Sequence, residues 1–167
     1  MADRTPDYTR MLELIPVRHP MVLVDRVESL VPGVEITTAK AVSGGDPCYA
    51  GMAEGLPAER YAFPRSLIIE SFGQSSALLW LGSENPPGAA DIDWVPLAGR
   101  IRDCHFHGSA YPGDVIRHTV RLHEVRDGTT AFMSGETRVG DRTVFTVGQL
   151  TAVRRPATVL ARGERSA

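Results

Sequence analysis

The chain has 167 residues, with 18 basic and 20 acidic side chains and a formal net charge of −2. This length suits one domain whose core is large enough to be stable without disulfides or metals. Nucleic-acid and anionic-membrane binding usually need an excess of Lys and Arg, so the charge balance argues against both as the main role.

The N-terminal part predicts a short helix followed by a β-hairpin. Residues Tyr8–Leu14 form the helix candidate, with Asp7 in place to cap it. Residues Met21–Leu30 read as a strand that turns at Val31–Gly33. Its partner, Val34–Val42, alternates between apolar and polar side chains, as a half-buried strand does.

A long irregular stretch and one strong helix come next. Residues 43–65 are rich in Gly and Pro. An irregular stretch of about twenty residues inside a compact domain is more often functional than idle. The helix expected over Ser66–Leu81 is apolar on nearly every face, and helices of that kind are buried.

The C-terminal half predicts four strands, namely Trp94–His107, Val115–Arg126, Thr130–Val139 and Thr143–Arg154. The dipeptides at 127–128 and 140–141 predict tight hairpin turns, so we expect these strands to form a meander of three hairpins. About six antiparallel strands can bury one apolar helix by curling around it, which makes an α+β domain. We expect this single domain to span residues 1–155 and residues 156–167 to form a flexible tail.

The cysteines and the first residues predict a compartment. Cys48 and Cys104 lie far apart and form no metal-ligand pattern, so we expect free thiols and no metal site. The first ten residues are polar and charged, unlike a signal peptide. No apolar run approaches the roughly 20 residues that cross a membrane. We therefore expect a cytoplasmic protein without membrane association.

Four segments carry a resemblance to a known family: Ile15–Val27 (IPVRHPMVLVDRV), Leu67–Gln74 (LIIESFGQ), Tyr111–Asp114 (YPGD) and Thr151–Val153. In this order they resemble the 3-hydroxyacyl-acyl-carrier-protein dehydratases of type II fatty-acid synthesis, whose helix motif reads L-I-I-E-A-x-x-Q. The resemblance covers nearly the whole domain. It implies the hot-dog fold, in which a sheet edge pairs with a second copy and two sites lie at the dimer seam.

The resemblance assigns a catalytic acid. In the family, a His from a G-H-F-P loop removes the α-proton, and a Glu on the central helix of the other subunit protonates the departing hydroxyl. Glu70 matches that Glu. A carboxyl among apolar neighbours is costly to bury as an ion, which favours the protonated, donating form. Gln74 lies one turn further on the same face, where it is placed to hold the carboxyl. An exposed surface Glu is the alternative reading.

The family's catalytic histidine is missing. Counting back from Glu70 without gaps places it at Leu56, and counting forward from Asp46 places it at Met52, so the loop carries an insertion relative to the family. Neither side chain accepts a proton. Arg65 replaces a family glycine at the helix N-terminus, where a backbone N–H would hold the thioester oxygen. We expect the cation to obstruct the usual acyl pose.

The resemblance also implies the surroundings of the acid. It implies that the substrate is carried on the phosphopantetheine of an acyl carrier protein and that the protein has no cofactor of its own. The candidate substrate-binding residues are Met52, Leu56, Phe63, Arg65, Gln74 and Phe106.

The five histidines are assigned to other roles. His105 and His107 flank Phe106 on a strand, so they should face away from the helix and into solvent. A metal site there would lack a third ligand. His118 and His123 are interpreted as surface residues, and His19 as structural.

Three functions remain open. Because the catalytic pair is assembled across a dimer, a subunit with Glu but no His completes one site when a homologous subunit supplies the His. We therefore favour a dehydratase component of a heterodimer, inactive alone, in fatty-acid or polyketide synthesis. The alternatives, which a homodimer would also allow, are a non-catalytic acyl-binding or scaffold protein and a thioesterase in which Glu70 activates water.

Overall fold

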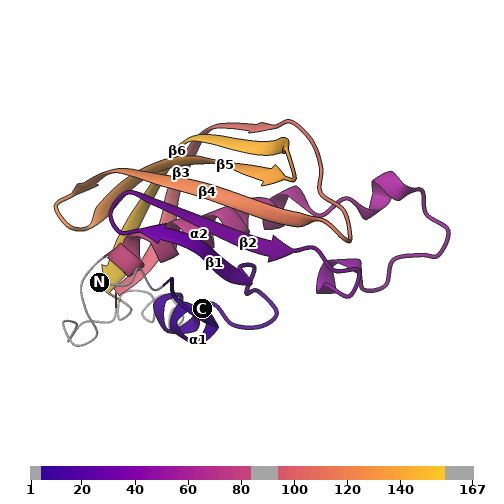
Figure 1. Cartoon of the computed structure of the whole chain (residues 1–167), viewed down its shortest axis with the longest axis horizontal. Helices are drawn as coiled ribbons and strands as arrows, with labels where there is room; N and C mark the ends of the chain where they lie inside the picture. The colour runs from indigo at the N-terminus through magenta and orange to yellow at the C-terminus, as the bar shows by residue number, and fades with distance from the viewer. Residues whose placement is uncertain (1–4, 84–93, 157–167) are drawn as a thin grey trace, which may run out of the picture.

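A curled antiparallel sheet wraps around one long helix (Figure 1). The computed structural model describes residues 5–83 and 94–156, so the predicted tail beyond Pro156 lies outside the described residues. The strands are β1 (Arg26–Val31), β2 (Glu35–Ala41), β3 (Trp94–Phe106), β4 (Val115–Arg126), β5 (Thr130–Val139) and β6 (Arg142–Pro156). The predicted α+β architecture of about six strands around a central helix is confirmed.

The strand order is β1-β2-β4-β5-β6-β3. The expected meander is therefore wrong at its first connection, because β3 does not pair with β4. β3 pairs with β6 at an edge of the sheet, and β4 pairs with β2. The turn at Tyr111–Asp114 explains this, because Gly113 N–H donates to Val42 O and Val42 N–H donates to Asp114 O, each at 2.9 Å. Gly113 has a φ of 99°, which favours glycine. The turn therefore joins the start of β4 to the end of β2.

The long helix α2 (Arg65–Ser83) confirms the predicted buried helix. Its inner face lies against the sheet, where Phe72, Leu78 and Leu79 are fully buried. The Phe72 ring meets the Phe145 ring of β6 edge-on, with ring centres 6.0 Å apart. Burial of this apolar face is the main source of stability expected for the domain.

The prediction for the N-terminal segment is confirmed in part. Helix α1 (Tyr8–Leu14) begins where expected, with the Asp7 carboxylate accepting from Arg10 N–H at 2.9 Å. The predicted strand over Met21–Leu30 begins only at Arg26. Residues 21–23 instead run along α2, because Leu23 N–H donates to the Gln74 side chain and not to a neighbouring strand.

The segment between β2 and α2 projects from one end of the sheet (Figure 1). It contains two short 3₁₀ turns, η1 (Pro47–Tyr49) and η2 (Ala58–Tyr61). Its base is fixed by the buried Lys40 ammonium, which lies 3.3 Å from the Asp46 carboxylate. Near its end, Phe63 N–H donates to Ala110 O at 2.7 Å. The base of the projection is therefore well held, while its middle lies away from the sheet.

We expect Gly135→Ala to destabilise the domain by about 2 kcal/mol or more, because the new methyl group has no room. A Cβ at Gly135 would lie 2.1 Å from Thr119 O and 3.1 Å from the Phe72 ring. Gly44→Ala is the matched control, since nothing lies within 4 Å of a Cβ there. Thermal unfolding measures both variants, and equal melting temperatures would contradict the expectation.

Candidate active site

Glu70 lies half-buried in a groove of about 280 Å³ between α2, the segment before β1 and the start of β3. Among the described residues that line it, Glu70 is the one ionisable side chain. The lining residues are Ile15, Pro16, Val17, Glu70, Gly73, Gln74, Ala77, Pro96, Leu97 and Ala98. The groove thus presents a single carboxyl among mostly apolar surfaces, which suits a proton donor to an acyl substrate.

Gln74 holds the Glu70 carboxyl in a fixed orientation. Its side-chain oxygen accepts from Leu23 N–H at 2.9 Å, so its amide nitrogen must face the other way. That nitrogen donates to Met21 O at 2.7 Å and to Glu70 Oε1 at 2.9 Å. Because these contacts use both amide hydrogens, the predicted contact between Gln74 and Glu70 is present and directional.

His118 corrects the prediction of a surface histidine. It is fully buried under α2, with Nδ1 at 2.8 Å from Thr137 Oγ1 and Nε2 at 2.8 Å from Ser71 Oγ. Burial lowers the pKa of His118 to about 3, so the ring is neutral. The sequence contained a usable signal, since Ile116, His118 and Val120 alternate with outward polar side chains.

Met52 and Leu56 both lie half-buried on the projecting segment. In the described part of the chain, neither lines the groove beside Glu70. The Met52 N–H donates to Tyr49 O at 3.3 Å. Neither candidate position of the missing histidine therefore forms part of the groove around the Glu70 of the same chain.

Arg65 and Phe106 form a stack at the start of α2. The guanidinium carbon of Arg65 lies 4.9 Å from the centre of the Phe106 ring. That ring is stacked on Phe145, with ring centres 4.5 Å apart. Arg65 is exposed, and its stacking on Phe106 holds the cation beside the first turn of the helix.

A second cleft of about 460 Å³ lies at the base of the projecting segment. Phe63 lines it, together with His19, Lys40 and Cys48. Burial raises the pKa of the Cys48 thiol, so that thiol is not an activated nucleophile. Much of its lining comes from the family-like segment Ile15–Val27, but the sequence analysis assigned no cleft to that segment. The predicted substrate-binding residues are thus distributed over the groove, the second cleft, the stack and the projection.

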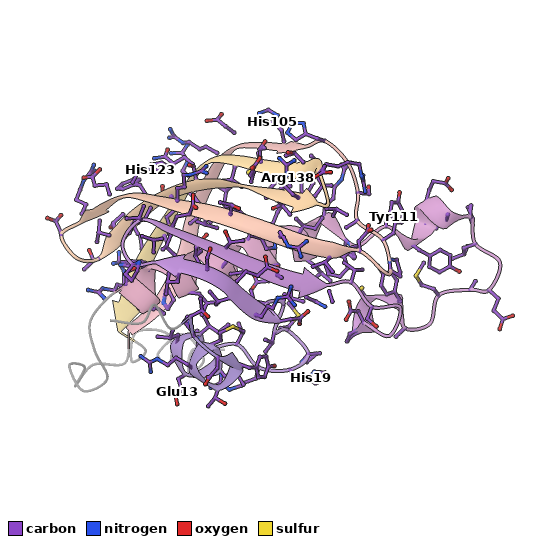
Figure 2. The ribbon with its side chains drawn as sticks, in the orientation of Figure 1. Glu13, His19, His105, Tyr111, His123 and Arg138 are labelled. Carbon is purple, nitrogen blue, oxygen red and sulfur yellow. The ribbon has the colours of Figure 1, made fainter. Side chains whose placement is uncertain are left out.

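The remaining histidines lie at the surface, as predicted for His105, His107 and His123. Figure 2 shows His105 and His123 on the outer side of the sheet, away from α2. The rings of His105 and His107 have their centres 6.3 Å apart. Within residues 5–83 and 94–156, no group of three His, Cys, Asp or Glu side chains is arranged to hold a metal ion.

The pattern of the FabA-like domain matches residues 15–148. The chain belongs to the FabA-like family. The 3-hydroxyacyl-[acyl-carrier-protein] dehydratase FabZ of Symbiobacterium thermophilum is 36% identical over 117 residues, which cover 70% of this chain and 76% of the relative. FabZ of Lactiplantibacillus plantarum is 31% identical over 138 residues, which cover 83% of this chain and 87% of the relative.

Solved structures support the hot-dog fold of this FabA-like chain. A chain of the dehydratase heterocomplex ApeI:P from Xenorhabdus doucetiae superposes with a TM-score of 0.75 at 16% identity. The superposition covers 98% of this chain and 100% of the ApeI:P chain. A hypothetical thioesterase with coenzyme A from Streptococcus pneumoniae superposes with a TM-score of 0.54 at 14% identity, covering 78% of this chain and 85% of the thioesterase chain. At such identities the likeness shows the fold alone.

No helix within the described residues of this FabA-like domain is long and apolar enough to cross a membrane. The predicted compartment and the predicted absence of a cofactor stay predictions.

Proposed function

We propose that this chain is a subunit of a 3-hydroxyacyl-acyl-carrier-protein dehydratase in which Glu70 is the acid and a homologous subunit supplies the base. The observation that carries the proposal is the Glu70 carboxyl, oriented by Gln74 in a mostly apolar groove. The dehydratase relatives support the reaction. The family resemblance supports a composite centre, because it implies that two subunits contribute to each site.

The chemistry requires two groups. A base removes the α-proton of the thioester, the bond from the β-carbon to the hydroxyl breaks, and an acid protonates the departing oxygen to give water and a 2-enoyl thioester. Because Gln74 donates to Glu70 Oε1, the transferable proton belongs on Oε2. A well-placed acid contributes about 10²–10⁴-fold in rate.

None of the five histidines of this chain is placed to act as the base. His118 has both ring nitrogens engaged in the core. His105, His107 and His123 are exposed on the sheet, and His19 lines the second cleft. We therefore assign the base for the Glu70 groove to another chain. The position of the groove supports this assignment, because it lies beside β3, an edge strand of the sheet.

The proposal is tested by mixing the purified chain with homologous subunits that retain a G-H-F-P loop. Dehydration of a 3-hydroxyacyl chain on an acyl carrier protein is followed by mass spectrometry. We expect the lone chain to be inactive and one pair to be active. Equal activity of the lone chain and the pair would overturn the proposal.

Restoring the histidine is expected to make the lone chain active. We expect either Met52→His or Leu56→His, combined with Arg65→Gly, to raise dehydration about 10²-fold above the parent, because a base then faces the partner's acid. The less active of the two histidine variants is the control for the other, and Arg65→Gly alone is the background. Failure of both variants, in a chain that gel filtration shows to form a dimer, would contradict a simple loss of the base.

Two other functions remain as outcomes of the same assays. Acyl carrier protein bound by the pair without dehydration would favour a non-catalytic role. Release of free thiol from an acyl thioester by the lone chain would favour a thioesterase.

A further inference from the structure

A line of hydrogen bonds leads from the core of the sheet to the acid. It starts at Thr137 of β5 and passes through His118 of β4 to Ser71 of α2, with donor–acceptor distances of 2.8 Å at both ends of the imidazole. Ser71 Oγ donates to Leu23 O at 2.6 Å. All three polar side chains are fully buried, so water does not compete for these bonds.

The direction of each bond follows from the available hydrogens. The Ser71 hydroxyl has one hydrogen, which goes to the Leu23 carbonyl, because a carbonyl only accepts. Ser71 Oγ must therefore accept from His118 Nε2–H. The Nδ1 atom of the neutral ring then accepts from the Thr137 hydroxyl. The structure thus fixes one tautomer of His118.

Leu23 joins this line to the acid. Its carbonyl accepts from Ser71, and its N–H donates to Gln74 Oε1 at 2.9 Å. Gln74 in turn donates to Glu70 Oε1 at 2.9 Å. Both backbone polar groups of Leu23 are therefore held by side chains of α2.

We propose that His118 is a positioning residue for Glu70, acting through Ser71, Leu23 and Gln74. This inference rests on the proposed role of Glu70 as the acid. His118 keeps the Ser71 hydroxyl aimed at Leu23, and Leu23 keeps the Gln74 amide aimed at the carboxyl. Without the contact between Ser71 and Leu23, the hydrogen bonds from residues 21–23 to α2 are only those with the Gln74 side chain.

One member of this anchor, Ser71, departs from the family motif that residues 67–74 resemble. The family motif L-I-I-E-A-x-x-Q has Ala where this chain has Ser71. A buried His and a buried Ser cost free energy unless both are satisfied, so neither is useful to the fold alone. The hydrogen bond between His118 and Ser71, and the bond from Ser71 to Leu23 O, suit a role in holding residues 21–23 against α2.

The test uses Ser71→Ala, His118→Met and the double variant in the reconstituted pair. Ser76→Ala is the matched control, because Ser76 is buried on the same helix and donates to Phe72 O within that helix. For Ser71→Ala we expect kcat to fall about tenfold with KM nearly unchanged, because a misplaced acid slows chemistry more than binding. Ser76→Ala should stay within about twofold.

The double variant separates positioning from stability. Ser71→Ala alone leaves the buried His118 Nε2–H without its acceptor, and the double variant removes that imidazole, although Leu23 O and the Thr137 hydroxyl still lose these partners. The melting temperature of the double variant should therefore recover in part relative to Ser71→Ala. Recovery of kcat together with the melting temperature would show that His118 is structural only and would overturn the proposal. If His118→Met does not fold, Ser71→Ala decides the question alone, and an unchanged kcat there would also overturn it.

Hydrogen exchange at Leu23 N–H distinguishes this proposal from the proposed function. We expect faster exchange in Ser71→Ala but not in Ser76→Ala, and imidazole ¹⁵N signals of an Nε2–H tautomer in the parent. Unchanged Leu23 exchange would refute the anchor even in an active pair. If the anchor is present and Glu70→Gln leaves the pair fully active, the proposed function fails, and the role of His118 in positioning an acid fails with it.

Discussion

In the reconstituted pair, Glu70→Gln is expected to lower kcat by about 10²–10⁴-fold, the usual contribution of a general acid. Gln has nearly the volume of Glu and offers an amide oxygen to accept from Gln74, so the groove should keep its shape. The amide has no acidic proton for the departing hydroxyl. Formation of the enoyl thioester on the acyl carrier protein measures the loss, and KM should change little.

Glu13→Gln is the control for this substitution. Glu13 is an exposed carboxylate on α1 that pairs with Arg10 at 2.9 Å, so its change should leave kcat unaltered (Figure 2). A Glu70→Gln pair that retains full activity would remove Glu70 as the acid. It would leave the groove as a binding surface and favour the non-catalytic role.

Most of the fold was predictable because local patterns encode it. The apolar run 66–81 predicted α2, and the bounds of β4 and β5 agree with the predicted strands. The pairing of β3 with β6 was not predictable, because alternation along a strand does not specify its partner. That choice depends on bonds between distant residues, such as the contacts of Val42 with the turn before β4.

The candidate site was predictable only where a motif covered it. The motif at 67–74 placed Glu70 and Gln74 on one face of α2, and the structure confirms their contact. His118 was misread because a polar residue in a strand was assumed to face water. Its partners Ser71 and Thr137 come from other elements, 47 and 19 residues away. In the proposed site, the residue that faces Glu70 comes from a second chain, which one sequence does not describe.

Acid is expected to destabilise the protein through His118 by about 1.4 kcal/mol per pH unit below its ordinary pKa. Burial holds the pKa of His118 at about 3 in the folded protein, against 6.5 in the ordinary state. Between these values the unfolded chain binds the proton and the folded chain does not. The contribution of His118 to the free energy of unfolding is therefore fully present above pH 6.5. It falls as the pH falls towards 3, by about 2 kcal/mol at pH 5.

The side chains that contact His118 support this assignment, because none of them carries a charge. They are the hydroxyls of Ser71 and Thr137 and the edge of the Phe72 ring, whose centre lies 5.9 Å from that of the imidazole. Urea unfolding at pH 7 and pH 5, at one protein concentration, measures the loss in the parent and in the double variant Ser71→Ala/His118→Met. The exposed histidines contribute equally to both proteins and cancel in the comparison. We expect a shallower pH dependence in the double variant, whereas equal slopes would mean that His118 takes up its proton without unfolding.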